Sequence, residues 1–530
     1  MRDFQKPGRS PAYGEHGMAA TSHPLATLTA LDVLRAGGKA VDAALAASAM
    51  LCVVEPHMTG VGGDCFALYA PAGGTGDGPV LALNGSGMAP AAATVDALRA
   101  LGLDSIGPES PHAVTVPGAV DAWCRLQEEH GTRGLDELFA PAIRRAEEGY
   151  AIHPRVAYDW AKHYQRVCGD ANARAVFGLD GRPPSPGDRH SQPALAATLR
   201  AITAQGRAGF YEGAVAEDMV DTLRGLGGLH TLDDFAAQRA DWVTPIRTAY
   251  RDHEVYECPP NGQGLAALVI LNILRGVPRF AELPPADRIH WLAEASKLAY
   301  HLRDTRFCDP RHGAVDVEGL LSDAMAERLR GAIDPQAAGP GIPPDGPEHR
   351  HTVYLCVVDR DGNAISFINS IFDLFGSTRM APKSGVMLHN RGQSFRLDPA
   401  HPNAIAPRKR PLHTIIPGML VKDGRAVMPF GVMGGQYQAV GHADLITGIL
   451  DHGLDPQAAM DRPRSFAHAG ILKMEATHDP ALIADLRRRG HTVEITPDPL
   501  GGSQAIHIDH ARGVLIGGSD PRKDGCAMGY

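Results

Sequence analysis

The feature that most constrains the fold is a proline- and glycine-rich tract, residues 335–347, that ends just before a strongly apolar run. Proline fixes φ and lacks a backbone N–H donor, so this tract can form neither a helix nor a central strand. Residues 353–358 are rich in valine, which is typical of a buried strand, and residues 364–369 return after the turn signal Asp361-Gly362. The sequence therefore predicts an exposed linker followed by a buried hairpin.

Thr352 stands where this linker becomes the first strand of the hairpin. An exposed segment before a buried strand is a feasible place for a chain cut. A cut between His351 and Thr352 would place a hydroxyl and a new α-amine on one residue. An α-amine has a pKa of about 7.7–8.0, so near neutral pH much of it is a free base that can take the hydroxyl proton. Thr352 is therefore a candidate nucleophile with its own base, and the alternative is an ordinary threonine at a strand start.

The length and composition of the chain limit the classes of protein to which it can belong. The chain has 530 residues, a formal net charge of −9 and 44% hydrophobic residues, enough for a large core in one large domain or in two to three smaller ones. Acidic and basic residues are mixed along the sequence, so we expect no nucleic-acid partner. The longest apolar run, residues 43–54, is too short to span a bilayer, and the first residues lack the hydrophobic region of a signal peptide. The scattered cysteines favour neither disulfides nor a zinc site, and a cytoplasmic location without a membrane partner is expected.

Helices and strands are both predicted along the chain. Leucines at helical spacing predict a helix that opens near Pro24, with Ser22 as its cap, and stops at Gly37-Gly38. An alanine-rich helix follows to about residue 54, and residues 112–118 are expected to form a strand with a turn. Further helices are predicted from residue 121, at 265–274 and at 291–300. The pattern indicates a mixed α/β protein with many loops.

A second glycine-rich segment follows the predicted strand at residues 427–430. There the adjacent Gly434 and Gly435 could aim backbone N–H groups at a developing oxyanion. The alternative is a plain turn.

Several motifs, taken together and in order, resemble one family, the γ-glutamyltranspeptidases. They lie at residues 17–26, 37–44, 54–63, 116–118, 297–300, Thr352 with 357–364, 409–412 and 433–435. The resemblance covers nearly the whole chain. It implies an α+β fold, the four-layer αββα sandwich of the N-terminal-nucleophile hydrolases.

The resemblance also implies a zymogen that cuts itself before Thr352. Residues 1–351 would form a large chain and residues 352–530 a small chain, held together as one intertwined domain, with a possible (αβ)2 assembly. Thr352 would attack the substrate amide, and Gly434 and Gly435 would supply the oxyanion donors. Neither a cofactor nor a metal is implied.

Other family positions fall on candidate substrate-binding residues. His413 and Thr414 occupy two positions that face the substrate carboxylate and are usually hydroxyl residues in the family. Ser370, at the end of the returning strand, belongs to the same candidate group.

This sequence departs from the glutathione-cleaving pattern at the positions that hold a glutamyl group. Ser86 stands where those members carry a carboxylate-binding arginine, and Ser394 stands where they carry the acid that holds the α-amine. Arg391 replaces an amide side chain, and Phe372 replaces an asparagine. The catalytic positions are kept while the glutamyl-binding positions are changed. This pattern is similar to a divergent, unsecreted branch that includes oxamate amidohydrolase and some cephalosporin acylases.

Three functions are compatible with this pattern. The first is a self-processing amidohydrolase that transfers the acyl group of a small carboxylate-bearing amide to water or an amine. The second is a true γ-glutamyl hydrolase or transferase that acts on glutathione or γ-glutamyl amides. The third is an inactive family fold used as a scaffold, which the retention of Thr352 and the Gly434-Gly435 pair argues against.

Overall fold

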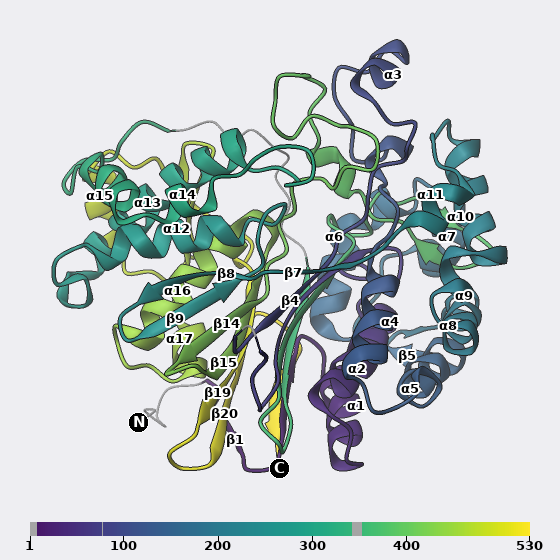
Figure 1. The fold of residues 1–530 in the computed structure, drawn as a ribbon, viewed down its shortest axis with the longest axis horizontal. Coiled ribbons are helices and arrows are strands. Elements are labelled where there is room, and N and C mark those ends of the chain that lie inside the picture. Colours follow the sequence, from purple (N-terminus) through teal and green to yellow (C-terminus); the bar gives the residue numbers. More distant parts are fainter. Residues whose placement is uncertain (1–7, 77, 342–351) are drawn as a thin grey trace.

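A computed structural model describes residues 8–76, 78–341 and 352–530. In these ranges the strands form two large seven-stranded sheets and three smaller ones. The two large sheets lie face to face in the middle of the molecule, and helices cover both outer faces (Figure 1). This arrangement confirms the predicted α+β, four-layer αββα sandwich.

Sheet B, as we name it, carries the predicted hairpin at its centre, and its neighbouring strands are antiparallel. In spatial order its strands are β21 (Cys526–Gly529), β2 (Met18–Thr21), β10 (Val353–Val358), β11 (Ala364–Ser370), β3 (Asp64–Ala70), β4 (Leu81–Gly85) and β7 (Asp241–Val243).

Sheet A is the second large sheet and is also antiparallel. In spatial order its strands are β1 (Ala12–Gly14), β20 (Val514–Ser519), β19 (Gly502–Asp509), β15 (Arg425–Met433), β14 (Gly418–Lys422), β9 (His253–Glu257) and β8 (Ile246–Tyr250). The smaller sheets pair β5 (Tyr150–Ala151) with β6 (Arg189–His190), β12 (Met380–Ala381) with β13 (Val386–Met387), and β16 (Ser465–His468) with β17 (Ile471–Met474) and β18 (Val493–Ile495).

The helices divide into two groups by position in the chain. The first group precedes residue 240, and its helices α1, α2 and α4 contact strands of sheet B: α1 (Pro24–Arg35), α2 (Ala40–Val54), α3 (Val95–Ala100), α4 (Ala119–His130), α5 (Leu135–Glu148), α6 (Pro154–Val167), α7 (Ala171–Phe177), α8 (Pro193–Gln205), α9 (Ala208–Tyr211), α10 (Gly213–Gly225) and α11 (Leu232–Ala237). The second follows residue 263, and its helices α12, α16 and α17 contact strands of sheet A: α12 (Gly264–Arg275), α13 (Pro285–Arg306), α14 (Val317–Leu321), α15 (Asp323–Gly331), α16 (Gln438–Leu450), α17 (Pro456–Asp461) and α18 (Pro480–Arg488).

Strand β10 shows why the chain forms layers. Its alternate residues Val353, Leu355 and Val357 belong to the core between sheet B and its helices. The residues between them, Tyr354, Cys356 and Val358, belong to the core between the two sheets. Successive side chains of a strand point to opposite faces, so a strand buried on both faces reads as one apolar run. This explains the sequence signal at residues 353–358.

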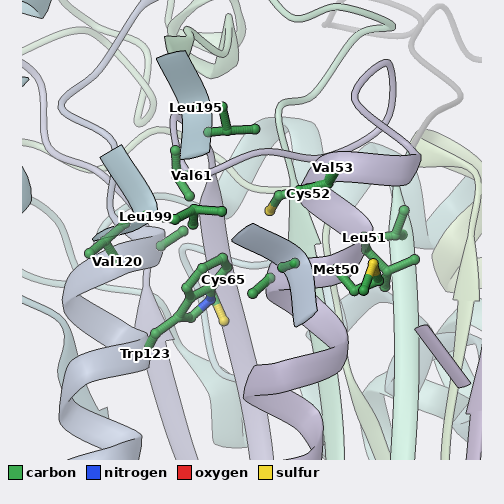
Figure 2. Close-up of a cluster of buried hydrophobic side chains, with 14 of the residues drawn as sticks. Met50, Leu51, Cys52, Val53, Val61, Cys65, Val120, Trp123, Leu195 and Leu199 are labelled. Carbon is green, nitrogen blue, oxygen red and sulfur yellow. The ribbon is translucent and has the colours of Figure 1, made fainter. Parts of the chain in front are cut away.

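The core beside sheet B is packed around α2, every residue of which is buried. Figure 2 shows part of this core, in which side chains of α2 share one buried cluster with Cys65 of β3 and Trp123 of α4. Alanines on α2 leave room for the helix to approach the sheet closely. The predicted second helix, ending near residue 54, is confirmed.

Segments from both sides of Thr352 alternate within the sheets. In sheet B, β10 lies between β2 from early in the chain and β11, and β11 lies against β3. In sheet A, β1 from the start of the chain pairs with β20, and β9 pairs with β14. The backbone carbonyl of Tyr530 accepts hydrogen bonds from the N–H groups of Glu15 (2.9 Å) and His16 (2.7 Å).

Two local predictions were wrong. The cap of α1 is His23, whose side chain accepts a hydrogen bond from the Leu25 N–H, while Ser22 donates instead to Glu55 at 2.5 Å. Residues 112–118 form no strand. Their backbone follows a short 3-10 turn at 111–113, and the Val116 N–H donates to the Met88 carbonyl of a loop rather than to a neighbouring strand.

None of the helices in the described ranges is long and apolar enough to cross a membrane.

Candidate active site

One end of sheet B gathers four polar residues from neighbouring strands. The register pairs Val353 with Asn369, Ser370 with Asp64, and Cys65 with Gly85. Continuing each pairing by one residue sets Thr352 beside Ser370 and Ser86 beside Asp64. The end of the sheet therefore presents Thr352, Ser370, Asp64 and Ser86 in a row.

The hydroxyl of Thr352 is buried and held from two sides. It donates to the Ser370 hydroxyl at 3.4 Å, and it accepts a hydrogen bond from the side-chain amide of Gln438 at 3.3 Å. The Ser370 hydroxyl in turn accepts the N–H of Phe372 at 2.9 Å. Contacts of this length are typical of catalytic groups before substrate binding, when hydrogen bonds are often long. The arrangement fixes the direction of the Thr352 Oγ1 atom.

The Gly434-Gly435 turn leads from β15 into α16, whose first residue, Gln438, donates to this hydroxyl. The two glycines have φ values of +125° and +57°, which residues with a side chain rarely adopt. The amide of Gln263 donates to the carbonyls of both Gly435 (3.0 Å) and Thr414 (2.7 Å). One buried amide thus ties the glycine turn to the Thr414 segment.

A buried carboxylate, Asp64, organises the other side of the site. It accepts the N–H groups of Gly87 (2.8 Å) and Gly118 (3.1 Å) and the Nε2–H of His413 (2.9 Å). Burial alone would raise the pKa of Asp64, but His389 and His413 outweigh this effect and lower the pKa to about 2. Asp64 is therefore a carboxylate at neutral pH.

His413 is neutral at that pH. Burial, with the nearby Arg391 charge, lowers the pKa of His413 to about 3, although the bond to Asp64 acts in the opposite direction. The Ile415 N–H points at Nδ1 of His413 at 3.4 Å, which agrees with a proton on Nε2 only. His413 thus serves as a fixed donor to Asp64.

Arg391 is a buried candidate whose hydrogen-bond donors are only partly matched by the described residues. Its guanidinium is fully buried, lies over the ring of Phe372 at 4.1 Å, and donates from Nη1 to the Thr414 hydroxyl at 2.9 Å. Among the described residues, its Nε and Nη2 atoms have no hydrogen-bond partner. Burial lowers the pKa of Arg391 to about 9, although Asp64 and Asp373 act to raise it. A buried guanidinium with two unmatched donors is well suited to an anionic oxygen pair.

The remaining candidates have structural partners. The Ser394 hydroxyl lies 2.9 Å from the carbonyls of both Arg391 and Leu412 and so supports the turn that carries Arg391. The Ser86 hydroxyl donates to Asn84 at 2.7 Å and accepts from Asn261 at 3.1 Å. Both serines border the site without offering it a charge.

The structure thus brings most of the sequence-predicted candidates into one region. Thr352, Ser370, His413, Thr414 and Arg391 are linked through the contacts above, and the glycine turn joins them through Gln263. The predicted cleavage residue His351 lies outside the described residues.

Sequence reasoning missed several residues of the site. Asp64 follows the glycine motif at 60–63 directly, and Gln438 follows the glycine turn, so position next to a recognised motif was the available signal. Gln263 and His389 offered no such signal, because only the folded chain brings them to the site.

Comparisons with known proteins find relatives of nearly the whole chain. The gamma-glutamyltranspeptidase family profile matches residues 26–530. A glutathione hydrolase-like proenzyme of Bacillus subtilis is 36% identical over 97% of this chain and 99% of its own length. An oxamate amidohydrolase proenzyme of Klebsiella pneumoniae is 38% identical over 97% of this chain and 98% of its own length.

The same relationship holds for solved structures. The crystal structure of a cephalosporin acylase from Bacillus halodurans superposes with a TM-score of 0.93 at 40% identity, covering 100% of this chain and 99% of that one. Profile, relatives and structure each span nearly the whole chain, and on this evidence the protein belongs to the gamma-glutamyltranspeptidase family.

Proposed function

We propose that this protein is a self-processing amidohydrolase in which Thr352 attacks the amide of a small carboxylate-bearing substrate. The observation that carries the proposal is the setting of the Thr352 hydroxyl. It lies directly before the buried strand β10, between Ser370 and Gln438, and Gln438 begins the helix that follows the turn of two glycines. The relatives named as proenzymes support the self-processing part.

The chemistry follows from these groups. Once the chain is cut, the α-amine of Thr352 takes the hydroxyl proton while Oγ1 attacks the substrate carbonyl carbon. N–H groups of the Gly434-Gly435 turn bind the negative oxygen of the tetrahedral intermediate. The ammonium then gives its proton to the leaving amine, and an ester with Thr352 remains. Water, activated by the same amine, attacks this ester and releases the acid.

Arg391 supports a substrate with a free carboxylate. Its unmatched Nε and Nη2 donors lie side by side on one edge of the guanidinium, which suits a two-point contact with a carboxylate. A γ-glutamyl group would add an ammonium, which the Arg391 charge would repel and which Ser394 would not neutralise. We therefore propose amides of simple dicarboxylic acids, with an oxalyl (as in oxamate) or glutaryl acyl group, as substrates. The relative named oxamate amidohydrolase is consistent with this class.

Self-cleavage is tested by gel electrophoresis and N-terminal sequencing. Purified protein should separate under denaturing conditions into two chains, the second of which begins at Thr352. Thr352→Ala should remain one chain, whereas the matched Thr352→Ser variant keeps a hydroxyl and should still be cut. An intact, fully active wild-type chain would refute the mechanism.

Substrate choice is tested with a pair of anilides that differ only in the α-amino group, the glutaryl and the γ-glutamyl anilide. A charged hydrogen bond contributes roughly 1.5–3 kcal/mol, so we expect kcat/KM to favour the glutaryl compound by about 10- to 150-fold. Arg391→Gln should remove most of this preference. A tenfold preference for the γ-glutamyl compound would instead identify a γ-glutamyl hydrolase or transferase. If neither anilide is cleaved, oxamate is the next compound to test.

A further inference from the structure

A second cluster of reactive side chains lies away from the active site, on α13. His290 and Glu294 are one turn apart on this helix, and the turn after α18 brings His491 against them. All three are buried, with exposed fractions of 0%, 5% and 6%. One ligand atom from each lies within 4.8 Å of the others.

Hydrogen bonds settle which nitrogen of His290 faces the cluster. Nε2 of His290 lies 2.8 Å from the backbone carbonyl of Asp334, and a carbonyl can only accept, so Nε2 carries the proton. Nδ1 therefore presents a lone pair toward Nε2 of His491, at 2.8 Å. A histidine whose far nitrogen donates to a backbone carbonyl is the usual arrangement of a metal ligand, because the bond fixes the tautomer and the ring.

We propose that His290 Nδ1, His491 Nε2 and the Glu294 carboxylate bind one divalent cation of the zinc type. Two histidines and one carboxylate are a ligand set that Zn²⁺ takes, with bonds of about 2.0–2.2 Å and tetrahedral angles. Such bonds set neighbouring ligand atoms about 3.3 Å apart. The two nitrogens are 2.8 Å apart and His491 Nε2 is 3.9 Å from Glu294 Oε1, so small rotations of the side chains reach the required spacing. On binding, the proton on His491 Nε2 moves to Nδ1 through solvent, and the metal takes its place.

A lysine beside the cluster would compete with a metal ion for the Glu294 carboxylate. Lys297 donates to Glu294 Oε1 at 2.6 Å, and its side chain is 13% exposed, so it reaches solvent. The other nearby cation, Arg489, is engaged by Asp287 and Asp485. A metal ion would displace the Lys297 ammonium from the carboxylate.

The site would join segments on both sides of the cut proposed at Thr352. His290 and Glu294 precede that position and His491 follows it. The chain leading toward the cut is attached here as well, since Asp334 accepts from His290 and the Gly339 N–H donates to Glu294 at 3.1 Å. This linking role rests on the proposed function, whereas metal binding by the three residues does not.

Zinc binding by the purified protein tests the proposal. After treatment with a chelator and its removal, the protein should bind one equivalent of Zn²⁺ in calorimetry. Co²⁺ in its place should give the intense visible absorption of a tetrahedral site. Since loss of outer partners alone typically weakens metal binding about 10- to 100-fold, His491→Ala should weaken it at least as much. The matched control His301→Ala removes an exposed histidine of the same helix and should leave binding unchanged.

Lys297→Met gives an independent readout that does not depend on removing a buried ligand. It deletes the competing ammonium and keeps the apolar stem, so zinc should bind more tightly than in the wild type. Absence of stoichiometric zinc binding in both the wild type and Lys297→Met would overturn the proposal. Equal binding by His491→Ala would overturn it too. A wild type that is left uncut but still binds zinc would refute the cleavage mechanism alone.

Discussion

At the scale of single residues, the turn after β15 depends on two glycines that no other residue type replaces easily. Gly434 has a φ of +125°, and a Cβ atom there would lie 2.9 Å from the Cα of Gly501. The backbone of Gly501 cannot rotate away as a flexible side chain could. The position of the Gly434 and Gly435 N–H groups is therefore set by the absence of a side chain.

We expect Gly434→Ala to lower kcat sharply, because a displaced turn would lose one of the proposed oxyanion donors. Losing one such donor typically costs about 10²–10³ in kcat. Gly424→Ala is the matched control, since Gly424 also has a positive φ (+72°) but has nothing within 4 Å of an added Cβ. Steady-state kinetics of processed enzyme measures the effect, with self-cleavage scored separately. Normal kcat in Gly434→Ala would assign the turn a structural role only.

Single residues also show where sequence reasoning ends. Thr352 and the glycine pair were predicted because each stands at a local change, from linker to strand or from strand to turn. The unmatched donors of Arg391 and the low pKa of Asp64 were not predicted, because both depend on burial among distant segments. His413 was placed at the site by resemblance, yet its bond to Asp64 appears only in the folded chain.

At the scale of elements, the contact between β10 and β15 sets the distance between the two sheets. Gly431 of β15 faces Tyr354 of β10, and a Cβ on Gly431 would lie 2.3 Å from the tyrosine ring. The Tyr354 hydroxyl is bonded to Ser366 at 2.8 Å, so the ring has little freedom to move. Tyr354 is two residues from Thr352, so this contact also helps to position the proposed nucleophile.

Gly431→Ala should therefore destabilise the protein, because the ring and the sheets must move apart. Overpacking of a well-packed core typically costs about 1–3 kcal/mol. Gly73→Ala serves as the control, since Gly73 is exposed and has nothing within 4 Å of an added Cβ. Calorimetry should show a lower Tm for Gly431→Ala alone. An unchanged Tm would mean that the two sheets separate at no cost at this point.

Elements were predicted well where their pattern is local. The hairpin of β10 and β11 and helix α2 follow from uninterrupted apolar runs, and the structure confirms both. The segment at 112–118 was predicted as a strand from its valines. Its backbone instead forms hydrogen bonds with the loops around Met88 and Gly63. The residues of the segment itself give no indication of these distant hydrogen-bond partners.

At the scale of the whole molecule, several buried histidines couple the fold to pH. Burial lowers the pKa of His190 and His230 to about 4, and burial together with Arg391 lowers that of His413 to about 3. The folded chain thus keeps these side chains neutral at a pH where the unfolded chain, with ordinary histidine pKa values of about 6.5, protonates them. Their contribution to stability is complete above pH of about 6.5 and is lost as the pH falls toward these lowered values.

We expect Tm to fall steadily as the pH is lowered from 6.5 to 4. Each such histidine contributes up to about 1.4 kcal/mol per pH unit to the slope of the unfolding free energy. His190→Gln should make the slope shallower, whereas His301→Gln, at an exposed position, should not. A Tm that stays constant between pH 6.5 and 4.5 would contradict the buried, neutral state of these residues.

The contact between Tyr530 and the backbone of Glu15 and His16 makes a circular permutation of the chain feasible. A short linker could join these neighbouring residues, so a gene could encode the segment from Thr352 onward first and the preceding segment second. A circular permutant that begins at Thr352, runs to Tyr530 and continues through the linker from Glu15 to residue 341 would keep every strand of the two large sheets except the edge strand β1, which the linker replaces. After removal of its initiator methionine, it would carry the threonine amine from the moment of synthesis. Maturation and catalysis, which share Thr352 in the mechanism proposed here, would then be separated into independent events.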